Sequence, residues 1–579
     1  MYDRASTLAS VLDDPAGRGV LDRFLPGVAA SPMATQFRSA RLGQLAALIP
    51  ALEDPERRER FWAALADVGE GAGRAPYLPE VSPDRAYETM DVPQGSARLT
   101  VPPFVAQWGV LEVRLDGPSH GNPFLDVEVE AVFTRTSGDV RVGGFYDGDG
   151  TYLVRALADE PGEWTFRTVS TARSLDGITG AVTVIDPARG AHGPVRVDGF
   201  HFCHADGTRY RPQGTTAYAW THQEDALVDQ TLATLAETPF TKMRMCVFPK
   251  SYLFNANEPA DFPFPGSLAD GFNLTRFDPQ HFHRLEARIA RLAELGIEAD
   301  LILFHPYDRW GFVDLGPAVD DRYVRYVVRR LAAYANVWWA MANEYDLIWS
   351  KGESDWERLA AVVVAEDPFG HLQSIHNCRG FYDQSRPWIT HASIQRVDVY
   401  RTAENTDEWR NRWGKPVVVD ECAYEGDIDQ GWGNITGEEM VRRCWEGAVR
   451  GGYIGHGETY LSDDEVLWWS KGGALHGSSP ERMGFLDRIL AQAPYGVIDP
   501  LLSDWDVPWG GVAGRYLIGY FGFNRPRFRN VVLPEGEFAV DVIDTWAMTV
   551  ERLPGTYRST VRVPLPGRQY MAVRCTRVD

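Results

Sequence analysis

The chain lacks several features by which whole classes of protein are recognised. No apolar run approaches the roughly 20 residues that a membrane-spanning helix needs. The opening stretch, MYDRASTLASVL, has neither the basic leader nor the apolar core of a secretory signal. The six cysteines are far apart and form no C-x-x-C pair. We therefore expect a cytoplasmic protein with reduced thiols, without a disulfide framework or a zinc site.

Positive charge is also scarce. The chain carries 58 Lys and Arg against 80 Asp and Glu, which gives a formal net charge of -22. Nucleic acids and anionic membranes are bound through basic patches, so neither is expected as a partner. Aromatic residues, by contrast, are abundant, with 19 Trp and 23 Tyr. Most of them will pack in cores, but flat aromatic rings also stack on the apolar faces of sugars.

The chain is too long for one small core, and its sequence pattern changes along its length. Residues 1–85 show the three- and four-residue apolar spacing of short helices and end in a linker, GEGAGRAPYLPEVSP, at 69–83. Residues 95–198 alternate polar and apolar positions in short runs, which predicts a β-sandwich. Residues 501–579 repeat this alternation, so we expect a second, antiparallel β domain there.

Residues 199–500 alternate strand-like apolar runs with helical stretches such as 279–296 and 320–335. Eight candidate strands and about seven helical stretches are the number expected of an α/β fold of the (β/α)8, or TIM-barrel, type. A doubly wound sheet is the alternative, but it needs a Gly-rich phosphate turn after its first strand. The stretch GTTAYAWTH at that place is no such turn. We therefore predict a TIM barrel flanked by the two β domains and preceded by the helical segment.

Two of the predicted strands end in a carboxylate. WWAMANEYD (338–346) places Asn343 and Glu344 at the end of the fourth strand, and KPVVVDECAYEG (415–426) places Glu421 at the end of the seventh. The carboxyl ends of barrel strands gather around one mouth, so the two acids can face each other. Glycoside hydrolysis needs such a pair, with one acid protonated and the other ionised. Either glutamate taken alone could equally be a strand-end charge in water.

Asn-Glu after strand four together with Glu after strand seven resembles the signature of the clan A retaining glycoside hydrolases. Within that clan the chain is similar to the apiosidase-like glycosidases, in a branch with an N-terminal β-sandwich domain and a C-terminal β domain of unknown function. The stretch EVRLDGPSHGNPFLDVEVEAVF carries the resemblance in the first β domain. In the predicted barrel it is carried by GTTAYAWTHQ, MRMCVFPKSY, NVWWAMANEYD, VVDECAYEGDI and LWWSKGGALHG.

The resemblance implies a role for four residues. Glu344 matches the general acid/base and Glu421 the nucleophile of a double-displacement reaction. Asn343 matches the residue that hydrogen-bonds the sugar 2-hydroxyl, and Arg244 the arginine that supports the nucleophile and keeps it ionised. We expect a raised pKa for Glu344, because it faces a second acid and an aromatic wall.

The sequence departs from the wider clan at two strand ends. Many members carry a Tyr after strand six that hydrogen-bonds the nucleophile, whereas strand six here reads ITHASIQ. Many also place a Trp after strand eight as a sugar platform, whereas this strand ends in GHGETY. Trp468 and Trp469 follow in the next loop and are candidates to replace that platform.

Further polar and aromatic residues at strand ends are expected to line the sugar site, although each taken alone is more often structural. They are Trp220, His222, His305, Tyr307, Asp308, His376, Asn377, Gln395, Tyr424, Glu425, Glu458 and Trp469. His305, His376 and His456 with Glu458 could also be interpreted as a metal cluster, but no H-x-x-x-H or H-x-H spacing supports it. We expect neither a metal nor another cofactor.

The leading hypothesis is a retaining exo-glycosidase that acts on a small glycoside or oligosaccharide, pentosides and furanosides included. A carbohydrate-binding protein without activity is one alternative, and a metal-dependent hydrolase on the same barrel is another. The expected partner is the carbohydrate substrate alone. A homo-oligomer is compatible with the accessory segments, whose role the sequence does not define.

Overall fold

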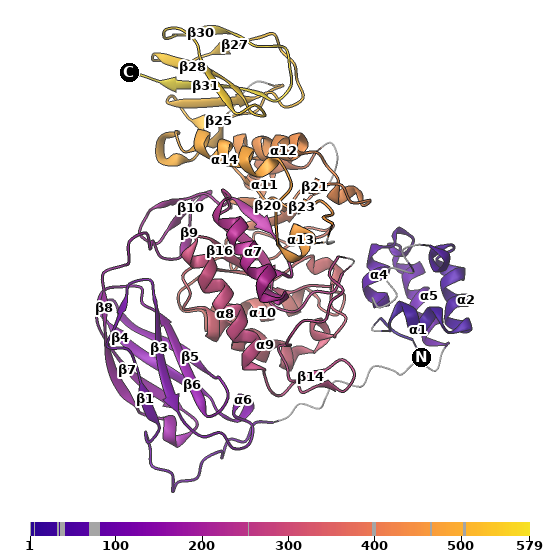
Figure 1. The fold of residues 1–579 in the computed structure, drawn as a ribbon, viewed down its shortest axis with the longest axis vertical. Helices are drawn as coiled ribbons and strands as arrows, with labels where there is room; N and C mark the ends of the chain where they lie inside the picture. The colour runs from indigo at the N-terminus through magenta and orange to yellow at the C-terminus, as the bar shows by residue number, and fades with distance from the viewer. Residues whose placement is uncertain are drawn as a thin grey trace.

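The computed structural model describes residues 2–4, 6–31, 34, 41–68, 82–252, 254–396, 401–463, 466–501 and 505–579. Four parts follow one another along the chain (Figure 1): helices, a β domain, a central α/β part and a second β domain. Most of the predicted linker, residues 69–81, lies outside the described residues. All six cysteines are free thiols. No helix of the described part is long and apolar enough to cross a membrane.

The first part is built from short helices with their own apolar core. The main ones are α1 (Leu8–Leu12), α2 (Pro15–Phe24), α4 (Leu42–Leu48) and α5 (Pro55–Ala66). Asp14 and Asp54 begin α2 and α5 by accepting backbone N–H hydrogen bonds, and each is followed by a proline whose fixed φ suits the first helical position.

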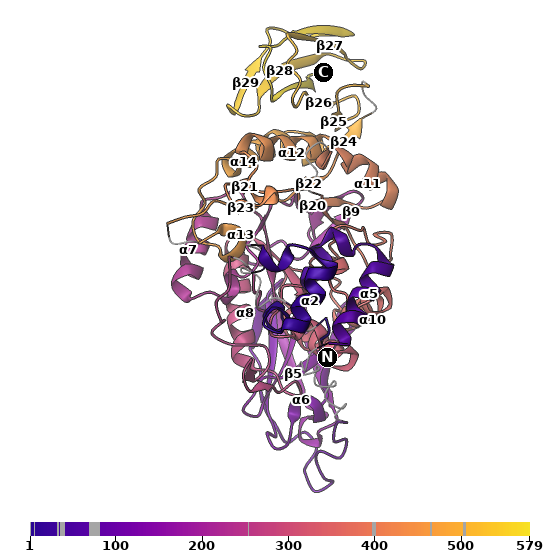
Figure 2. The same cartoon turned by 90° about the vertical axis from the view of Figure 1, so that its right-hand side faces the viewer.

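These helices dock on the central part. Arg41 pairs with Asp314 at 3.1 Å, and Glu53 pairs with Arg379 at 2.6 Å. Trp62 meets the ring of Trp349 edge-on, with 6.4 Å between ring centroids. Seen from the side, the helices lie in front of the central part (Figure 2).

The first β domain holds an eight-stranded arrangement in the order β1-β3-β6-β5-β4-β7-β8-β2. The strands are β1 (Arg98–Thr100), β2 (Phe104–Ala106), β3 (Val110–Asp116), β4 (Val129–Arg135), β5 (Gly138–Tyr146), β6 (Thr151–Leu157), β7 (Gly162–Ser170) and β8 (Thr179–Ile185). Strand β5 pairs with β4 over 138–143 and with β6 over 144–146, so it passes from one group of strands to the other. Trp164 and Phe166 show the alternation, since both are buried between exposed neighbours.

The central part is a mixed α/β structure around a strongly curled parallel sheet. One run of strands is β12 (Gly214–Thr216), β13 (Lys242–Cys246), β16 (Glu298–Phe304), β17 (Val337–Ala342) and β18 (Gln373–Ser374). A second run is β19 (Ala392–Gln395), β20 (Val417–Glu421) and β22 (Tyr453–Ile454). Isolated parallel bridges link the two runs at both ends, His376 with Ser393 and Thr215 with His456.

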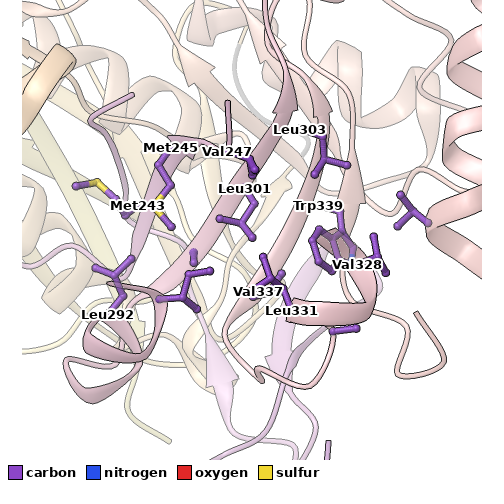
Figure 3. Close-up of a cluster of buried hydrophobic side chains, with 14 of the residues drawn as sticks. Met243, Met245, Val247, Leu292, Leu301, Leu303, Val328, Leu331, Val337 and Trp339 are labelled. Carbon is purple, nitrogen blue, oxygen red and sulfur yellow. The ribbon is translucent and has the colours of Figure 1, made fainter. Parts of the chain in front are cut away.

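Helices accompany these strands in alternation. They are α7 (Asp225–Ala236), α8 (Pro279–Glu294), α9 (Pro317–Leu331), α10 (Glu353–Glu366), α11 (Thr406–Trp413), α12 (Gly437–Val449), the short α13 (Trp468–Lys471) and α14 (Ser479–Leu490). Figure 3 shows Met243, Leu301 and Trp339 of neighbouring strands packing together with Leu292 of α8 and Leu331 of α9. Burial on both faces explains why the strands read as continuous apolar runs.

The last part is a six-stranded antiparallel sheet in the order β24-β25-β26-β31-β28-β29. Strands β27 and β30 form a separate antiparallel pair. The bounds are β24 (Asp499–Leu501), β25 (Trp509–Val512), β26 (Tyr516–Tyr520), β27 (Phe528–Val532), β28 (Phe538–Asp544), β29 (Thr549–Arg552), β30 (Thr560–Pro564) and β31 (Met571–Arg577). Tyr520 stacks on Trp445 of α12 with 5.5 Å between ring centroids, which joins this domain to the central part.

Candidate active site

An irregularity in β20 aims Glu421 into the site. Ile394 pairs with Val419 and Gln395 with Glu421, so Asp420 is an extra residue to which no residue of β19 is opposite in the strand register. Such a bulge re-aims the side chains next to it. Val417 and Val419 pack in the apolar core, and simple alternation would have sent Glu421 in the same direction.

The side chain of the extra residue, Asp420, takes part in a layer of ion pairs next to Glu421. The Asp420 carboxylate accepts from Lys242 Nζ at 2.7 Å and from Ser393 Oγ at 2.6 Å, and Lys242 also binds Asp300 at 2.6 Å. Lys242 and Arg244 hold the pKa of Asp420 below its usual range although it is buried. This layer of ion pairs therefore supports the strand immediately before Glu421.

The Glu421 carboxylate is surrounded by donors. Arg244 Nη1 lies 3.1 Å from its Oε1, and the Tyr218 hydroxyl donates to the same oxygen. Arg244 also donates to the Tyr218 hydroxyl at 2.9 Å. His376 Nε2 is 3.9 Å from Oε1. A guanidinium and a hydroxyl that both bind the charged form favour an ionised carboxylate.

Glu344 stands in a different environment. Its backbone has φ 49° and ψ 54°, in the left-handed region that is uncommon for a residue other than glycine. Strain of this kind costs about 1–3 kcal/mol and concentrates at functional sites. The Tyr307 hydroxyl donates to its carboxylate. Burial and then the neighbouring charge of Glu421 raise the pKa of Glu344 to about 7, as the sequence predicts.

One hydroxyl connects the two strand ends. Tyr218 follows β12, and its single hydroxyl proton is shared between Glu421 and Asn343 Oδ1, which lies 3.1 Å away. Asn343 precedes Glu344, so the carboxyl ends of β17 and β20 meet on either side of this tyrosine. The arrangement brings the two predicted acids into one site.

Lys250 lies among the rings that border this site. Its Nζ is 3.5 Å from the ring centroid of Tyr218, 4.3 Å from that of Trp469 and 4.6 Å from that of Tyr307. Burial lowers its pKa to about 8. The ammonium thus remains charged at neutral pH and stands between the tyrosine that binds Glu421 and the one that binds Glu344.

Several residues predicted from strand ends are found here. Tyr424 and Trp469 pack together with 6.3 Å between ring centroids, and the Trp469 indole N–H has no hydrogen-bond partner among the described residues. Burial and then the nearby Glu421 carboxylate raise the pKa of Tyr424. Gln395 is opposite Glu421 in the strand register, and its backbone is held by the side chain of Asn377 at 3.1 and 3.2 Å. Trp469 also meets the ring of Tyr218 edge-on, with 5.4 Å between ring centroids, whereas Trp468 donates to Thr215 in the core.

Four other predicted residues serve the surrounding structure. The Trp220 indole donates to Met245 Sδ at 2.9 Å within the apolar core, and His305 is bonded to the Phe248 carbonyl at 3.1 Å. The carboxylates of the other two are occupied by backbone N–H groups. Asp308 accepts from residues 310, 311 and 313, and Glu458 accepts from residues 476 and 477. The structure does not bring these groups to the two glutamates.

Two residues of the site, Tyr218 and Lys250, were not predicted to contact the acids or the substrate. Tyr218, in GTTAYAW after β12, donates to Glu421, whereas strand six provides no tyrosine, as the sequence indicates. Lys250 lies in a loop after its strand, as does the predicted Tyr307. A lysine four residues beyond a buried strand, as in MRMCVFPK, is the only sequence signal for Lys250. No group of three or more potential metal ligands gathers anywhere in the described ranges.

Comparison with known proteins identifies the family of the central part. A family model described as the catalytic domain of apiosidase-like proteins matches residues 197–496. Models of two domains of unknown function, DUF5060 and DUF5605, match residues 104–171 and 505–576. The family match and the solved relative described below define a glycoside hydrolase. More particularly, the chain belongs to the apiosidase-like family.

Solved structures extend the comparison. A protein of Bacteroides vulgatus ATCC 8482, described as a candidate glycoside hydrolase, is 37% identical with a TM-score of 0.78, covering 82% of this chain and 100% of its own. A glycoside hydrolase family 5 protein of the same organism is 16% identical with a TM-score of 0.55, covering 67% of this chain and 94% of its own. The second likeness concerns the fold alone. No curated protein matches the chain.

Proposed function

We propose that this glycoside hydrolase is a retaining exo-glycosidase in which Glu344 is the general acid/base and Glu421 the nucleophile. The observation that carries the proposal is the contrast between the two carboxyl groups. Glu421 is bonded by Arg244 and Tyr218, whereas burial raises the pKa of Glu344 to about 7. A carboxylate held by two donors is suited to attack, and an acid that keeps its proton near neutral pH is suited to donate it.

The reaction would run in two steps. Glu421 attacks the anomeric carbon while Glu344 donates its proton to the leaving oxygen, which gives a glycosyl-enzyme ester and the free aglycone. Glu344, now ionised, then takes a proton from water, whose oxygen attacks the anomeric carbon and releases Glu421. Two inversions give net retention. Asn343, beside the acid/base, would bind the sugar 2-hydroxyl.

The same proposal places the site at the mouth of a closed (β/α)8 barrel. Parallel pairing runs in chain order through β12, β13, β16, β17 and β18, and again through β19, β20 and β22. The bridges His376–Ser393 and Thr215–His456 join the two runs at both junctions, which supports closure. In such a barrel strands four and seven lie on opposite sides of the mouth.

Exo-action on small substrates is supported by the N-terminal helices. They contact residues that follow three successive strands, namely Asp314 after β16, Trp349 after β17 and Arg379 after β18. These loops belong to the same end of the strands as Glu344. Because the helices cover one side of this end of the strands, substrates that enter by one end are favoured. The proposal therefore extends to short glycosides of hexoses and pentoses, in pyranose or furanose form.

The test is a panel of nitrophenyl glycosides and disaccharides, furanosides included, with product stereochemistry followed by NMR. We expect retained configuration, and a loss of at least about 1,000-fold in kcat for Glu421→Gln. Glu344→Gln should lose less on nitrophenyl substrates than on disaccharides, because a good leaving group needs little acid help. Glu298→Gln is the matched control, since it also removes a buried carboxyl of the central sheet but one that bonds only to Trp338. An inverted product, or equal effects of Glu421→Gln and Glu298→Gln, would contradict the proposal.

A further inference from the structure

The Lys250 ammonium has an unusual set of neighbours. Four aromatic rings surround it, those of Tyr218, Trp469, Tyr307 and, at 5.6 Å, Tyr252. The side chain is almost fully buried, with 3% of its surface exposed. The faces of the rings attract its positive charge but are poor acceptors for its three N–H groups.

Among the described residues, no protein group accepts a hydrogen bond from the Lys250 ammonium. No carboxylate of the described residues lies within ion-pair distance of Lys250 Nζ, although both glutamates are close enough for their charges to act on its pKa. Glu421 is already engaged by Arg244 and Tyr218, and Glu344 by Tyr307. An ammonium is costly to bury without acceptors, so the hydrogen bonds of Lys250 are completed from outside the protein, by water or by a group of the substrate.

The local charges indicate the charge that such a substrate group would carry. In the form that starts the reaction, Glu421 is ionised and Glu344 holds its proton, so Arg244 and Lys250 are two cations facing one anion. Asp300 and Asp420 are engaged by Lys242 in the layer below, at 2.6 and 2.7 Å. Arg244 thus has Glu421 as its partner and Lys242 has both aspartates, whereas Lys250 is a cation of this site that has no carboxylate partner among the described residues.

We infer that Lys250 binds a carboxylate carried by the glycone, so that the preferred substrates are glycosides of uronic acids. The inference rests on the proposed function and names its substrate class. A bare ammonium beside the anomeric centre would oppose the positive charge of an oxocarbenium-like transition state. A uronate carboxylate pairs with the ammonium and removes this opposition, while a neutral sugar leaves it in place.

The inference is tested with pairs of nitrophenyl glycosides that share a ring and differ at C5, namely glucuronide with glucoside or xyloside and galacturonide with galactoside. The wild-type kcat/KM should favour the uronide of the accepted pair. Lys250→Met should lower kcat/KM for the uronide by about 10- to 100-fold, the size of one charge-assisted hydrogen bond, and lower that for its neutral partner by much less. Lys250→Arg should restore part of the preference, and exposed Arg18→Gln controls for the loss of one charge. The uronide preference should also decline above about pH 8 as the ammonium loses its proton.

The outcomes separate this inference from the proposed function. Retaining hydrolysis of neutral glycosides with no uronide preference, or an equal loss on both members of the pair in Lys250→Met, would overturn the role of Lys250 and leave the glycosidase intact. Absence of hydrolysis across the whole panel would instead contradict the proposed function. In that case calorimetric titration with free glucuronic acid and free galacturonic acid, with glucose as the neutral control, tests the role of Lys250 without catalysis. Binding of one of the acids that is lost in Lys250→Met supports the inference. Binding that shows no preference for the acids over glucose refutes it.

Discussion

Removing the hydroxyl of Tyr218 should slow the enzyme markedly while leaving its fold unchanged. In Tyr218→Phe the ring stays beneath Lys250, 3.5 Å from its Nζ, so only the hydrogen bonds are lost. The hydroxyl donates to the ionised Glu421 and accepts from Arg244. A hydrogen bond to a charged group is worth about 1.5–3 kcal/mol. Because about 1.4 kcal/mol corresponds to tenfold in rate, kcat/KM should fall about 10- to 150-fold.

The assay is kcat/KM on an accepted nitrophenyl glycoside, with the melting temperature measured in parallel. Tyr323→Phe is the matched control, because it also removes a buried hydroxyl that makes one hydrogen bond, here to the Leu303 carbonyl at 3.0 Å. Tyr323→Phe should change stability at most slightly and leave kcat/KM within about threefold. If Tyr218→Phe is no slower than Tyr323→Phe, the hydroxyl does not hold the nucleophile and the reasoning fails.

Four further predictions follow from the same geometry. With the pKa of Glu344 raised to about 7, kcat/KM should fall as pH rises above about 7, and Glu344→Gln should lose this basic limb; a limb that survives in the variant would assign it to another group. Azide added to Glu421→Ala should give a glycosyl azide of inverted configuration, and azide added to Glu344→Ala one of retained configuration, as NMR of the products will show; the opposite pairing would exchange the two roles. Trp349→Ala removes the ring that faces Trp62 and the Arg4 and Arg58 guanidinium groups, so trypsin should release the N-terminal helices faster and longer oligosaccharides should become better substrates relative to disaccharides. Burial raises the pKa of Glu298 to about 8 from an ordinary 4.5, so the folded state binds this proton more tightly and loses stability as pH rises between these values; urea unfolding of Glu298→Gln should show a weaker decline over that range than the wild type, and identical slopes would contradict the assignment.

The class of fold and the two acids were predictable because each depends on a pattern that the strands impose. Strands covered on both faces must be apolar throughout, and residues at their carboxyl ends are freed from that requirement. VWWAMA followed by Asn343 and Glu344, and VVV followed closely by Glu421, therefore mark both the strands and the site. The predicted strands HLQSIHN and GGYIGHGETY are also present, but only as the two-residue strands β18 and β22. Their pairing continues through single bridges at His376 and His456, which no apolar run announces.

The surroundings of the acids could not be predicted, because they depend on local departures from regular geometry. Period-two alternation gives no sign of the bulge at Asp420, and without the bulge Glu421 would point toward the helices. The left-handed backbone of Glu344 is equally invisible in a sequence without glycine at that place. Tyr218 and Lys250 come from loops whose paths are set by tertiary contacts. Residues at strand ends, by contrast, are predicted to line the sugar site from their position alone. This is why Trp220 and Asp308 were expected near the substrate and were found supporting the core and a turn.

These departures have a common physical reason. The two catalytic candidates lie at the ends of buried strands, where regular geometry would give one of them an apolar environment without partners. The bulge and the left-handed residue turn both carboxyl groups toward polar partners, and each conformation is unfavourable by itself. The layer made by Lys242, Asp300 and Asp420 holds the bulge from below, and the Tyr218 hydroxyl ties the two strand ends from above. Hydrogen bonds and ion pairs therefore stabilise the two unfavourable backbone conformations of the site. The groups that form these bonds can be buried only because they are paired with one another.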